Sequence, residues 1–401
     1  MIAWFRYICL IVSLIITMPE LLSAQRLVSQ RQEDVEAGLL YNESVYILSN
    51  YSCLSSNSPE KLSLDELLRK QIEGFYFYLK RDTETNVLLL RKPDGTFTPF
   101  SESLEAIKTA LDADSTKVMT LFLDFYVETE LESSFKEIGL MEYVLEYDTK
   151  NGWPSLKDML SSGKRLVVFE VQKHLNSPSW LHNMRDFVEH TDADWGNQPE
   201  GVESFDERLK KNLSLFTGYK FLETSRGNSN DISALARQTP YLIESFKRAW
   251  IRDGRVPNFI LVDKYYAWLD VSLVTFRNFD IIYGAVTNNN ELLNYVNWDG
   301  MSNYTTGKYC FPLEPGAELM LSPISPGYRI EPATVYVSGT QRKAFASDFK
   351  ARPLRIDEDI EIYLPFEGDE KDGSSNHNLT VSRNVEFIQD PIRGQVASLE
   401  N

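Results

Sequence analysis

The sequence predicts an α/β fold with parallel strands, followed by a C-terminal β extension. Short apolar segments alternate with amphipathic ones from Val45 to about Val296, and this alternation is typical of β/α units. After Pro312 several prolines and glycines come close together, so regular helical spacing stops there. The apolar segments predict strands at Val45–Ser49, Gly74–Lys80, Val118–Val127, Arg165–Val171, Asn258–Tyr265 and Ile281–Val286.

Helix starts between these strands are marked by capping residues. Ser63 is followed by Glu66 and Ser155 by Asp158, so each serine can accept a backbone N–H bond while the acid favours the helix N-terminus. The segment 231–253 carries apolar residues at helical spacing and stops before a glycine. It predicts a long helix that covers the sheet.

The composition is that of a folded protein with an excess of acids. Of the 401 residues, 43% are hydrophobic and 25% are charged, which excludes a disordered or collagen-like chain. The formal net charge of −17 repels polyphosphates, so we do not expect nucleic acid as a partner. The sequence also has no phosphate-loop motif and no Gly-x-Ser-x-Gly elbow.

The N-terminus has the pattern of a secretory signal. Arg6 precedes the apolar run Ile8–Ile16, and small residues end at Ala24. The run is shorter than the roughly 20 residues that cross a bilayer. We therefore expect residues 1–24 to be a signal peptide cleaved near Ala24, giving a secreted, periplasmic or extracellular protein without a transmembrane segment.

Two cysteines remain after the predicted cleavage, Cys53 and Cys310. In an oxidising compartment they can pair and join the two ends of the domain. They can equally be two separate buried thiols, because disulfide connectivity cannot be read from a sequence. The sequence leaves both alternatives open.

The C-terminal part divides into a linker with irregular β-structure, residues 313–355, and an acidic tail, residues 356–401. In the tail, Tyr363–Asp369, Asp372–Asn378 and Gly394–Leu399 are similar to the opening strands of a laminin-G/concanavalin-like sandwich. This resemblance implies a module that binds glycans, in some cases with calcium. Because about 40 residues cannot bury a sandwich core, we expect a truncated, exposed segment.

Two segments of residues 25–312 resemble a known enzyme family. Trp153–Leu160 with Ser162–Phe169 looks like a helix entering a central strand of the phosphatidylinositol-specific phospholipase C X-domain family, and Pro257–Asp263 is similar to its late strand. The resemblance implies a distorted TIM-type (β/α) barrel and a phosphoric diester hydrolase. It also implies a site at the C-terminal ends of the strands.

The residues at the family's catalytic positions differ in this chain. The family uses two histidines for general acid and base catalysis, one after each of the first two strands, and here Asn50 occupies the first position. The second strand starts after Glu73 and carries Tyr76 and Tyr78 where carboxylates would project, and Arg91 follows without a histidine. These altered residues predict a non-catalytic or altered protein.

The four histidines of the chain do not replace the missing pair. They are His174, His182, His190 and His377, and none lies before residue 174. His182 and His190 are two helical turns apart, about 12 Å along a helix, which is too far for one metal ion. We expect surface histidines and no metal site, unless His174 moves in from the central strand.

Other polar residues follow the predicted strands and suggest an alternative chemistry. Asp124 and Glu170 end neighbouring strands, so they can form an acid pair as in glycoside hydrolysis, or can be solvated rim residues. Lys80, Asp263 and Lys264 also end strands and are candidate ligand-binding residues.

The sequence therefore predicts a secreted barrel that resembles a phospholipase C and lacks its catalytic histidines. The expected partner is a small polyol, sugar phosphate or glycan, bound by a monomer, with no cofactor except calcium at the tail. The alternative is a divergent metal-dependent phosphodiesterase or a glycosidase that uses Asp124 and Glu170.

Overall fold

The computed structural model describes most of the chain from residue 31 onward and divides it into two compact units. The described ranges are 31–52, 62–69, 72–125, 131–172, 177–192, 215–219, 247, 250–251, 254–262, 278–299, 304–305, 307–339, 341–355, 385–390 and 394–399. The first unit comprises Met1–Ile282, Cys310–Glu318 and Ser338–Ala344, and the second comprises Tyr283–Tyr309, Leu319–Val337 and Phe345–Asn401.

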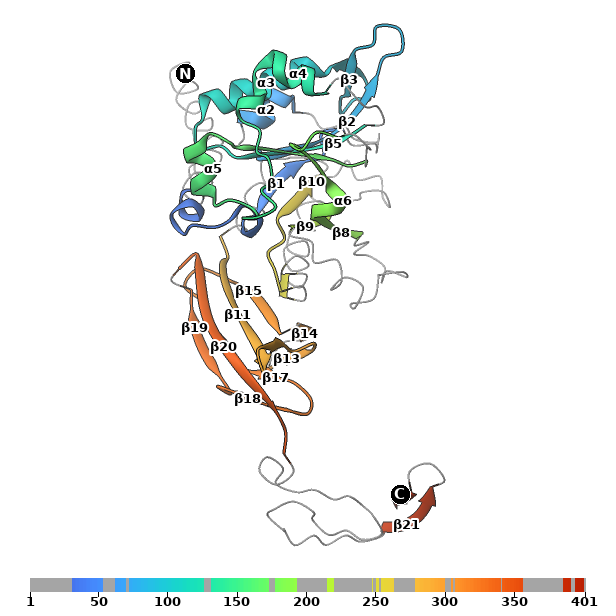
Figure 1. The fold of residues 1–401 in the computed structure, drawn as a ribbon, viewed down its shortest axis with the longest axis vertical. Coiled ribbons are helices and arrows are strands. Elements are labelled where there is room, and N and C mark those ends of the chain that lie inside the picture. Colours follow the sequence, from blue (N-terminus) through green and yellow to red (C-terminus); the bar gives the residue numbers. More distant parts are fainter. Residues whose placement is uncertain are drawn as a thin grey trace, which may run out of the picture. The chain divides into compact units, whose positions relative to one another are not determined.

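A parallel sheet forms the centre of the first unit (Figure 1). Its order is β7-β6-β5-β2-β1-β10-β9-β8. Five of its strands fall on the predicted segments, whereas β7, β8 and β9 were not predicted. The bounds are β1 Tyr46–Ser49, β2 Gly74–Arg81, β5 Met119–Asp124, β6 Leu166–Glu170, β7 Leu181–Asn183, β8 Val188–Asp192, β9 Leu215–Tyr219 and β10 Phe259–Val262.

This sheet curves back toward itself. β7 and β8 lie at opposite ends of the strand order, yet only the four-residue helix α6 (Met184–Phe187) joins them. The rings of Phe122 on β5 and Phe259 on β10 also lie 5.2 Å apart, although β2 and β1 separate their strands in the sheet. The mixed α/β prediction is confirmed and the curvature is that of a barrel, but a closed barrel is not shown.

Aromatic side chains fill the inside of the curve. Phe122 stacks on Phe169 with ring centroids 5.1 Å apart, and Trp153 lies 6.2 Å from Phe169. Tyr41 adds its ring 4.9 Å from that of Trp153 and 6.2 Å from that of Phe259. Burying such large rings stabilises the curved sheet mainly through the apolar surface removed from water.

Helices cover the outer face of the sheet near β2 and β5, and α3 lies between α2 and α4 (Figure 1). The capping predictions are confirmed: Ser63 Oγ accepts a bond of 3.3 Å from the Glu66 N–H, and Ser155 Oγ accepts one of 3.0 Å from the Asp158 N–H. The bounds are α2 Leu64–Arg69, α3 Phe100–Ala113, α4 Leu131–Ile138 and α5 Leu156–Ser162, with 3₁₀ turns at Tyr41–Glu43 and Leu140–Glu142.

A hairpin extends β2 beyond the parallel sheet. β3 (Leu88–Arg91) pairs antiparallel with the end of β2, and β4 (Phe97–Pro99) pairs antiparallel with β3. The sequence reading did not predict these short strands. The predicted helix 231–253 lies mostly outside the described residues, although residues 247, 250 and 251 are helical.

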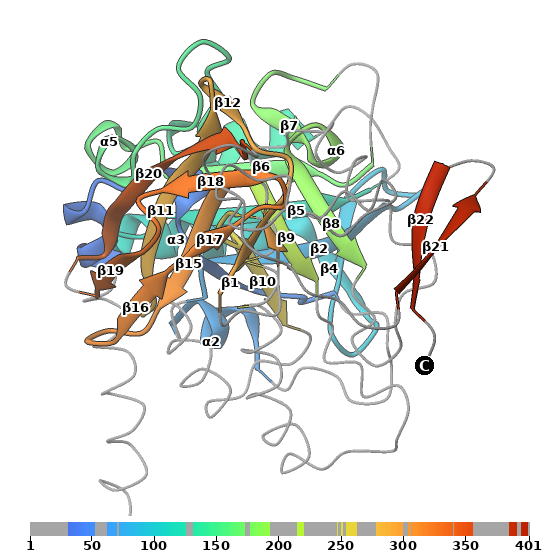
Figure 2. The same ribbon diagram turned by 90° about the horizontal axis from the view of Figure 1, so that it is seen from below.

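Short strands dominate after residue 279. Figure 2 shows β20 beside β11 and β18, in a sheet of order β12-β11-β20-β18 with β15 on β11; β14-β13-β17, β16-β19 and β21-β22 form smaller sheets. The bounds are β11 Asp280–Asn288, β12 Glu291–Leu292, β13 Val296–Trp298, β14 Tyr304–Thr305, β15 Lys308–Leu313, β16 Glu318–Leu321, β17 Pro323–Ile324, β18 Tyr328–Glu331, β19 Val335–Ser338, β20 Lys343–Pro353, β21 Val385–Asp390 and β22 Gly394–Leu399.

These strands correct one expectation and refine another. The predicted strand Ile281–Val286 does form, as part of β11, but it pairs antiparallel with β12 instead of joining the parallel sheet. The segment 313–355, expected to be a linker with irregular β-structure, does contain β-structure, as the five regular strands β16 to β20. Its glycines form turns between strands, because Gly316 and Gly327 have φ angles of 77° and 78°. Frequent turn residues therefore mark short strands here.

Several predicted segments lie outside the described residues. They include residues 1–30 with the predicted signal peptide, Cys53, and residues 356–384 of the tail. The described end of the tail is the antiparallel hairpin of β21 and β22, which does not confirm a laminin-G/concanavalin-like domain. Among the described helices, none has the length and apolar character needed to cross a bilayer.

Candidate functional site

The side chains of β2 alternate between the two faces of the sheet. Phe75 and Phe77 point toward the helices, and the ring of Phe77 lies 5.9 Å from that of Phe100 on α3. Tyr76 and Tyr78 take the opposite, inner face, because successive residues of a strand point to opposite sides. Both tyrosines are half-buried. The inner face near the strand ends is therefore polar as well as aromatic.

A hydrogen-bonded group forms where β2, β5 and β6 end. Tyr76 lies beside Phe122 in register and its hydroxyl donates a bond of 2.8 Å to Asp124 Oδ2. The amide of Gln172, just beyond β6, donates a bond of 3.4 Å to Asp124 Oδ1. Asp124 is half-buried, so both carboxylate oxygens keep lone pairs that a ligand hydroxyl can use.

Basic residues continue this face onto the hairpin. Lys80 follows Tyr76 and Tyr78 on the same side of β2, and its ammonium lies 3.7 Å above the ring of Phe97 on β4. Arg91 is the register partner of Phe97 and follows Leu90, the partner of Leu79. Continuing that ladder by one residue places Arg91 opposite Tyr78. Lys80 and Arg91 thus share a face with the two tyrosines.

The loop after β1 contacts the same region. Asn50 directly follows β1 and is buried, and Tyr51 packs edge-on against Phe77 at 5.8 Å. Ser52 donates a bond of 2.8 Å to the carbonyl of Arg91, and its own N–H bonds the carbonyl of Tyr76 at 3.3 Å. Asn50 therefore follows the end of β1 in a loop that is tied to β2 and β3.

Glu170 lies on the other face from Asp124. It is the register partner of Leu123, the residue before Asp124, so the two carboxylates leave opposite sides of the sheet. Glu170 is buried and accepts bonds of 2.6 Å from Ser177 Oγ and 3.1 Å from Asn183 Nδ2. The structure does not bring the proposed acid pair together, because each carboxylate has its own set of donors.

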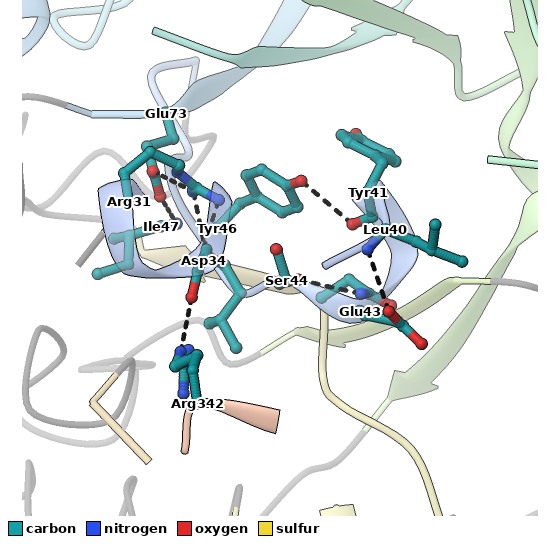
Figure 3. A network of polar contacts seen from close by, with 12 residues as sticks. Arg31, Asp34, Leu40, Tyr41, Glu43, Ser44, Tyr46, Ile47, Glu73 and Arg342 are labelled. Carbon is teal, nitrogen blue, oxygen red and sulfur yellow. Dashed lines mark hydrogen bonds and ion pairs between the residues drawn. The ribbon is translucent and has the colours of Figure 1, made fainter. Parts of the chain in front are cut away.

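Glu73 lies at the opposite end of the strands from the other candidates. It precedes β2, and its carboxylate is held by Arg31 and accepts a bond of 3.1 Å from the Ile47 N–H at the start of β1 (Figure 3). In barrels of this class that end of the strands serves stability. The position of Glu73 is thus structural rather than part of the candidate site.

His182 corrects the expectation of a surface histidine. It lies on β7 as the register partner of Phe169, and its ring is 5.7 Å from those of Phe169 and Trp153. Its Nε2 is 3.1 Å from the Leu145 carbonyl. Burial lowers the pKa of His182, although the bond to Leu145 and the charge of Glu146 act in the opposite direction. No apolar strand pattern was recognised around residue 182, so the sequence did not predict this burial.

Four other candidates lie outside what can be placed. Asp263, Lys264 and His174 are not among the described residues, and the side chain of His190 is not described. Cys310 is buried and accepts a bond of 3.0 Å from the Trp250 indole N–H, so its pairing with Cys53 stays untested. Across the described residues, no group of three or more His, Cys, Asp or Glu side chains is placed to hold a metal ion.

Sequence reasoning missed the residues that connect the site. Gln172, Ser52 and Phe97 all lie in loops or in the short hairpin, where no strand pattern marked them. The two-residue spacing of Tyr76, Tyr78 and Lys80 on one strand was the available signal for a shared face. That spacing is visible in the sequence, but the face is completed only by Arg91 and Phe97 of the hairpin.

Comparison with known proteins supports a resemblance to phospholipases C of the phosphatidylinositol-specific class. The family model described as PI-PLC X 1 matches residues 90–199. This match includes Arg91 and Asp124 but not Asn50, Tyr76 or Tyr78. A search of curated proteins gave no match.

Solved structures of the same enzyme class are similar to this chain at low identity. A mutant phosphatidylinositol-specific phospholipase C from Staphylococcus aureus has 14% identity and a TM-score of 0.38, covering 61% of this chain and 96% of its own. The phosphatidylinositol-specific phospholipase C from Listeria monocytogenes has 12% identity and a TM-score of 0.40, and the match covers 62% of this chain and 98% of that enzyme. PLC21 from S. officinalis has 11% identity and a TM-score of 0.32, and the match covers 58% of this chain and 31% of that protein. These values do not assign any residue or activity.

Proposed function

We propose that the first unit binds a small phosphorylated polyol at the C-terminal ends of its strands without hydrolysing a phosphodiester. The observation that carries the proposal is the shared inner face of β2, β3 and β5. It joins the hydrogen-bonded group of Tyr76 and Asp124 to the bases Lys80 and Arg91. The resemblance to the PI-PLC X 1 family supports a phosphorylated polyol as the ligand class.

Each half of this face suits one part of such a ligand. The carboxylate of Asp124 accepts hydrogen bonds from neighbouring hydroxyls, and Tyr76 and Gln172 hold that carboxylate in place. Lys80 and Arg91 supply positive charge, in a chain whose net charge is −17, and attract a phosphate. Asp124 and Arg91 are half-buried and Lys80 is exposed, so all three charged groups can meet a ligand.

We propose that the chain does not hydrolyse a phosphodiester, because its histidines do not stand where the family has its catalytic acid and base. No histidine precedes residue 174, so neither strand-end position of the family motif carries one. His182 lies among buried rings on β7, and burial lowers its pKa, so it does not serve as a surface acid or base. Glu170 leaves the other side of the sheet, so among the described residues it does not form an acid pair with Asp124.

Titration of the purified full chain with inositol 1-phosphate, inositol and inorganic phosphate tests the binding. We expect inositol 1-phosphate to bind more tightly than either half. Asp124→Asn should lower the affinity for inositol and for inositol 1-phosphate alike, by about ten- to hundredfold. Lys80→Met should lower only the affinity for the phosphorylated ligand, by about the same factor. Lys136→Met, which removes an exposed lysine paired with Glu132 on α4, is the matched control and should change nothing.

Release of inositol phosphate from phosphatidylinositol vesicles tests the second half of the proposal, with calcium and with EDTA. Release at the background rate in both conditions, together with binding, supports a binding protein. Release above background would replace it with an active enzyme, and dependence on calcium would identify a divergent metal-dependent phosphodiesterase. Failure to bind any of the three probes would overturn the proposed ligand class.

A further inference from the structure

The pairing of β1 with β2 depends in part on a side chain. The register of the two strands pairs Ser49, the last residue of β1, with Phe75, the second residue of β2. At their N-terminal ends the Glu73 N–H donates a bond of 3.1 Å to the Ile47 carbonyl. The Ile47 N–H donates one of 3.1 Å to the Glu73 carboxylate, not to a backbone carbonyl. The carboxylate of Glu73 therefore occupies the place of a backbone acceptor.

Arg31 holds this carboxylate in position. Its guanidinium forms an ion pair with Glu73 and lies 4.7 Å from the ring centre of Tyr46 on β1. It also reaches Asp34 at 3.4 Å and the Val45 carbonyl at 3.4 Å. Burial by itself would lower the pKa of Arg31, but the charges of Glu73 and Asp34 outweigh it and raise the pKa. Arg31 is thus a fully charged link between Glu73 and Asp34.

A segment from much later in the chain completes the network. We call residues 338–344 the strap; residue 340 lies outside the described residues. Arg342 donates a bond of 2.6 Å from Nε to Asp34 Oδ1 (Figure 3). The strap is anchored by its backbone, since the Ile281 N–H bonds the Arg342 carbonyl at 2.9 Å and the Gly339 N–H bonds the Ala317 carbonyl at 3.0 Å.

The strap makes one buried and one partly exposed ion pair. The side chains of Arg342 and Asp34 are 7% and 1% exposed, whereas those of Lys343 and Glu43, which also pair, are 25% and 27% exposed. A buried charge that loses its partner pays a large desolvation penalty, while an exposed pair contributes little. Arg342 is therefore the residue of the strap on which the network depends.

We propose that the strap is a conformational latch. Arg342 fixes Asp34, Asp34 and Glu73 together fix Arg31, and Glu73 then holds the start of β1 against the start of β2. Because Asn50 and Tyr76 each follow the tied residues Ile47 and Glu73 by three positions, this restraint also sets where Asn50, just after β1, and Tyr76, inside β2, stand. The latch thus couples residue 342 to the candidate site through three carboxylate and guanidinium groups in sequence.

Residue-by-residue amide exchange of the full chain tests the latch with the variant Arg342→Met. We expect the Ile47 amide to exchange roughly tenfold faster or more, because Asp34 no longer fixes Arg31 firmly and the Glu73 carboxylate that accepts the Ile47 hydrogen is held less tightly. The Leu121 amide on β5 should change less than about twofold. Lys108→Met, which breaks the exposed Lys108–Asp112 pair on α3, is the control and should leave Ile47 unchanged.

Three outcomes are decisive. Selective acceleration at Ile47 supports the latch. Equal acceleration at Ile47 and Leu121 shows that Arg342 only stabilises the unit as a whole, and an unchanged Ile47 shows that the strap does not reach β1; both overturn the proposal. If Arg342→Met is not recovered folded, Arg342→Lys keeps the charge and must give the same selectivity with a smaller rise. An unselective rise in that variant contradicts the latch equally.

Discussion

The two ends of the parallel sheet treat polar groups in opposite ways. At the N-terminal ends, Arg31, Asp34 and Glu73 are buried and form ion pairs, which Arg342 extends by its pair with Asp34. Toward the C-terminal ends, Tyr76 and Asp124 are half-buried, and the neutral hydroxyl of Tyr76 donates a hydrogen bond to the carboxylate of Asp124. Removing one partner from the buried ion pairs leaves a buried charge and lowers stability strongly. The half-buried carboxylate of Asp124 can still accept hydrogen bonds from a ligand. The difference teaches that charge density alone does not mark the functional end of this sheet.

The largest expected effect breaks the network at the N-terminal ends. Arg31→Met leaves Glu73 and the Asp34 oxygen nearest Arg31 buried without that cation, so we expect a loss of about 3–5 kcal/mol in the free energy of unfolding. Urea denaturation measures it. Lys136→Met should cost no more than about 1 kcal/mol, since its pair with Glu132 is exposed. Similar losses in the two variants would remove the contrast between buried and exposed charges.

A pH-dependent effect of intermediate size is expected inside the sheet. Burial lowers the pKa of His182, so the unfolded chain takes up this proton at a higher pH than the folded chain. The stabilising contribution is complete above the unfolded pKa of about 6.5 and is lost as the pH falls below it. The original chain should therefore lose more stability than His182→Phe between about pH 7 and pH 5. Parallel urea titrations at both pH values would show it; equal losses would contradict it.

The smallest effect is expected at the C-terminal ends. Tyr76→Phe removes the hydroxyl that bonds Asp124 but keeps the ring, and water can replace the lost bond because both residues are half-buried. We expect about 0.5–1.5 kcal/mol of lost stability, measured in the same denaturation series. A loss as large as that of Arg31→Met would mean that both ends are structural, and the proposed binding face would lose its main support.

The strand pattern predicted β1, β2, β5, β6 and β10 of the parallel sheet, because the signal of these strands is local. The first four residues of β6, Leu166 to Phe169, are continuously apolar, as strands buried on both faces are, and the caps at Ser63 and Ser155 depend on residues within one turn. The pairing of β11 with β12 could not be read in the same way. An isolated strand with apolar residues looks alike in a parallel and an antiparallel sheet until its partners are known.

The candidate site was predictable only where it follows a strand. Tyr76 and Tyr78 were identified through the family resemblance, and Lys80 and Asp124 by their places at predicted strand ends. The partners of Asp124 and Lys80 were not, because Gln172 and Phe97 come from a loop and a short hairpin. The opposite faces of Asp124 and Glu170 depend on a one-residue register between β5 and β6, which apolar patterning does not fix.

The bond between Arg342 and Asp34 has a consequence for biosynthesis. The two residues are 308 positions apart, so a ribosome adding roughly 5–20 residues per second makes Asp34 some 15–60 seconds before Arg342. During that interval Asp34 can pair with Arg31 but lacks Arg342, so the oxygen that Arg342 later binds must remain hydrated or find a temporary partner. The emerging N-terminal half is thus expected to stay open to chaperones until the strap is made, and a translational pause before residue 342 would prolong that exposure.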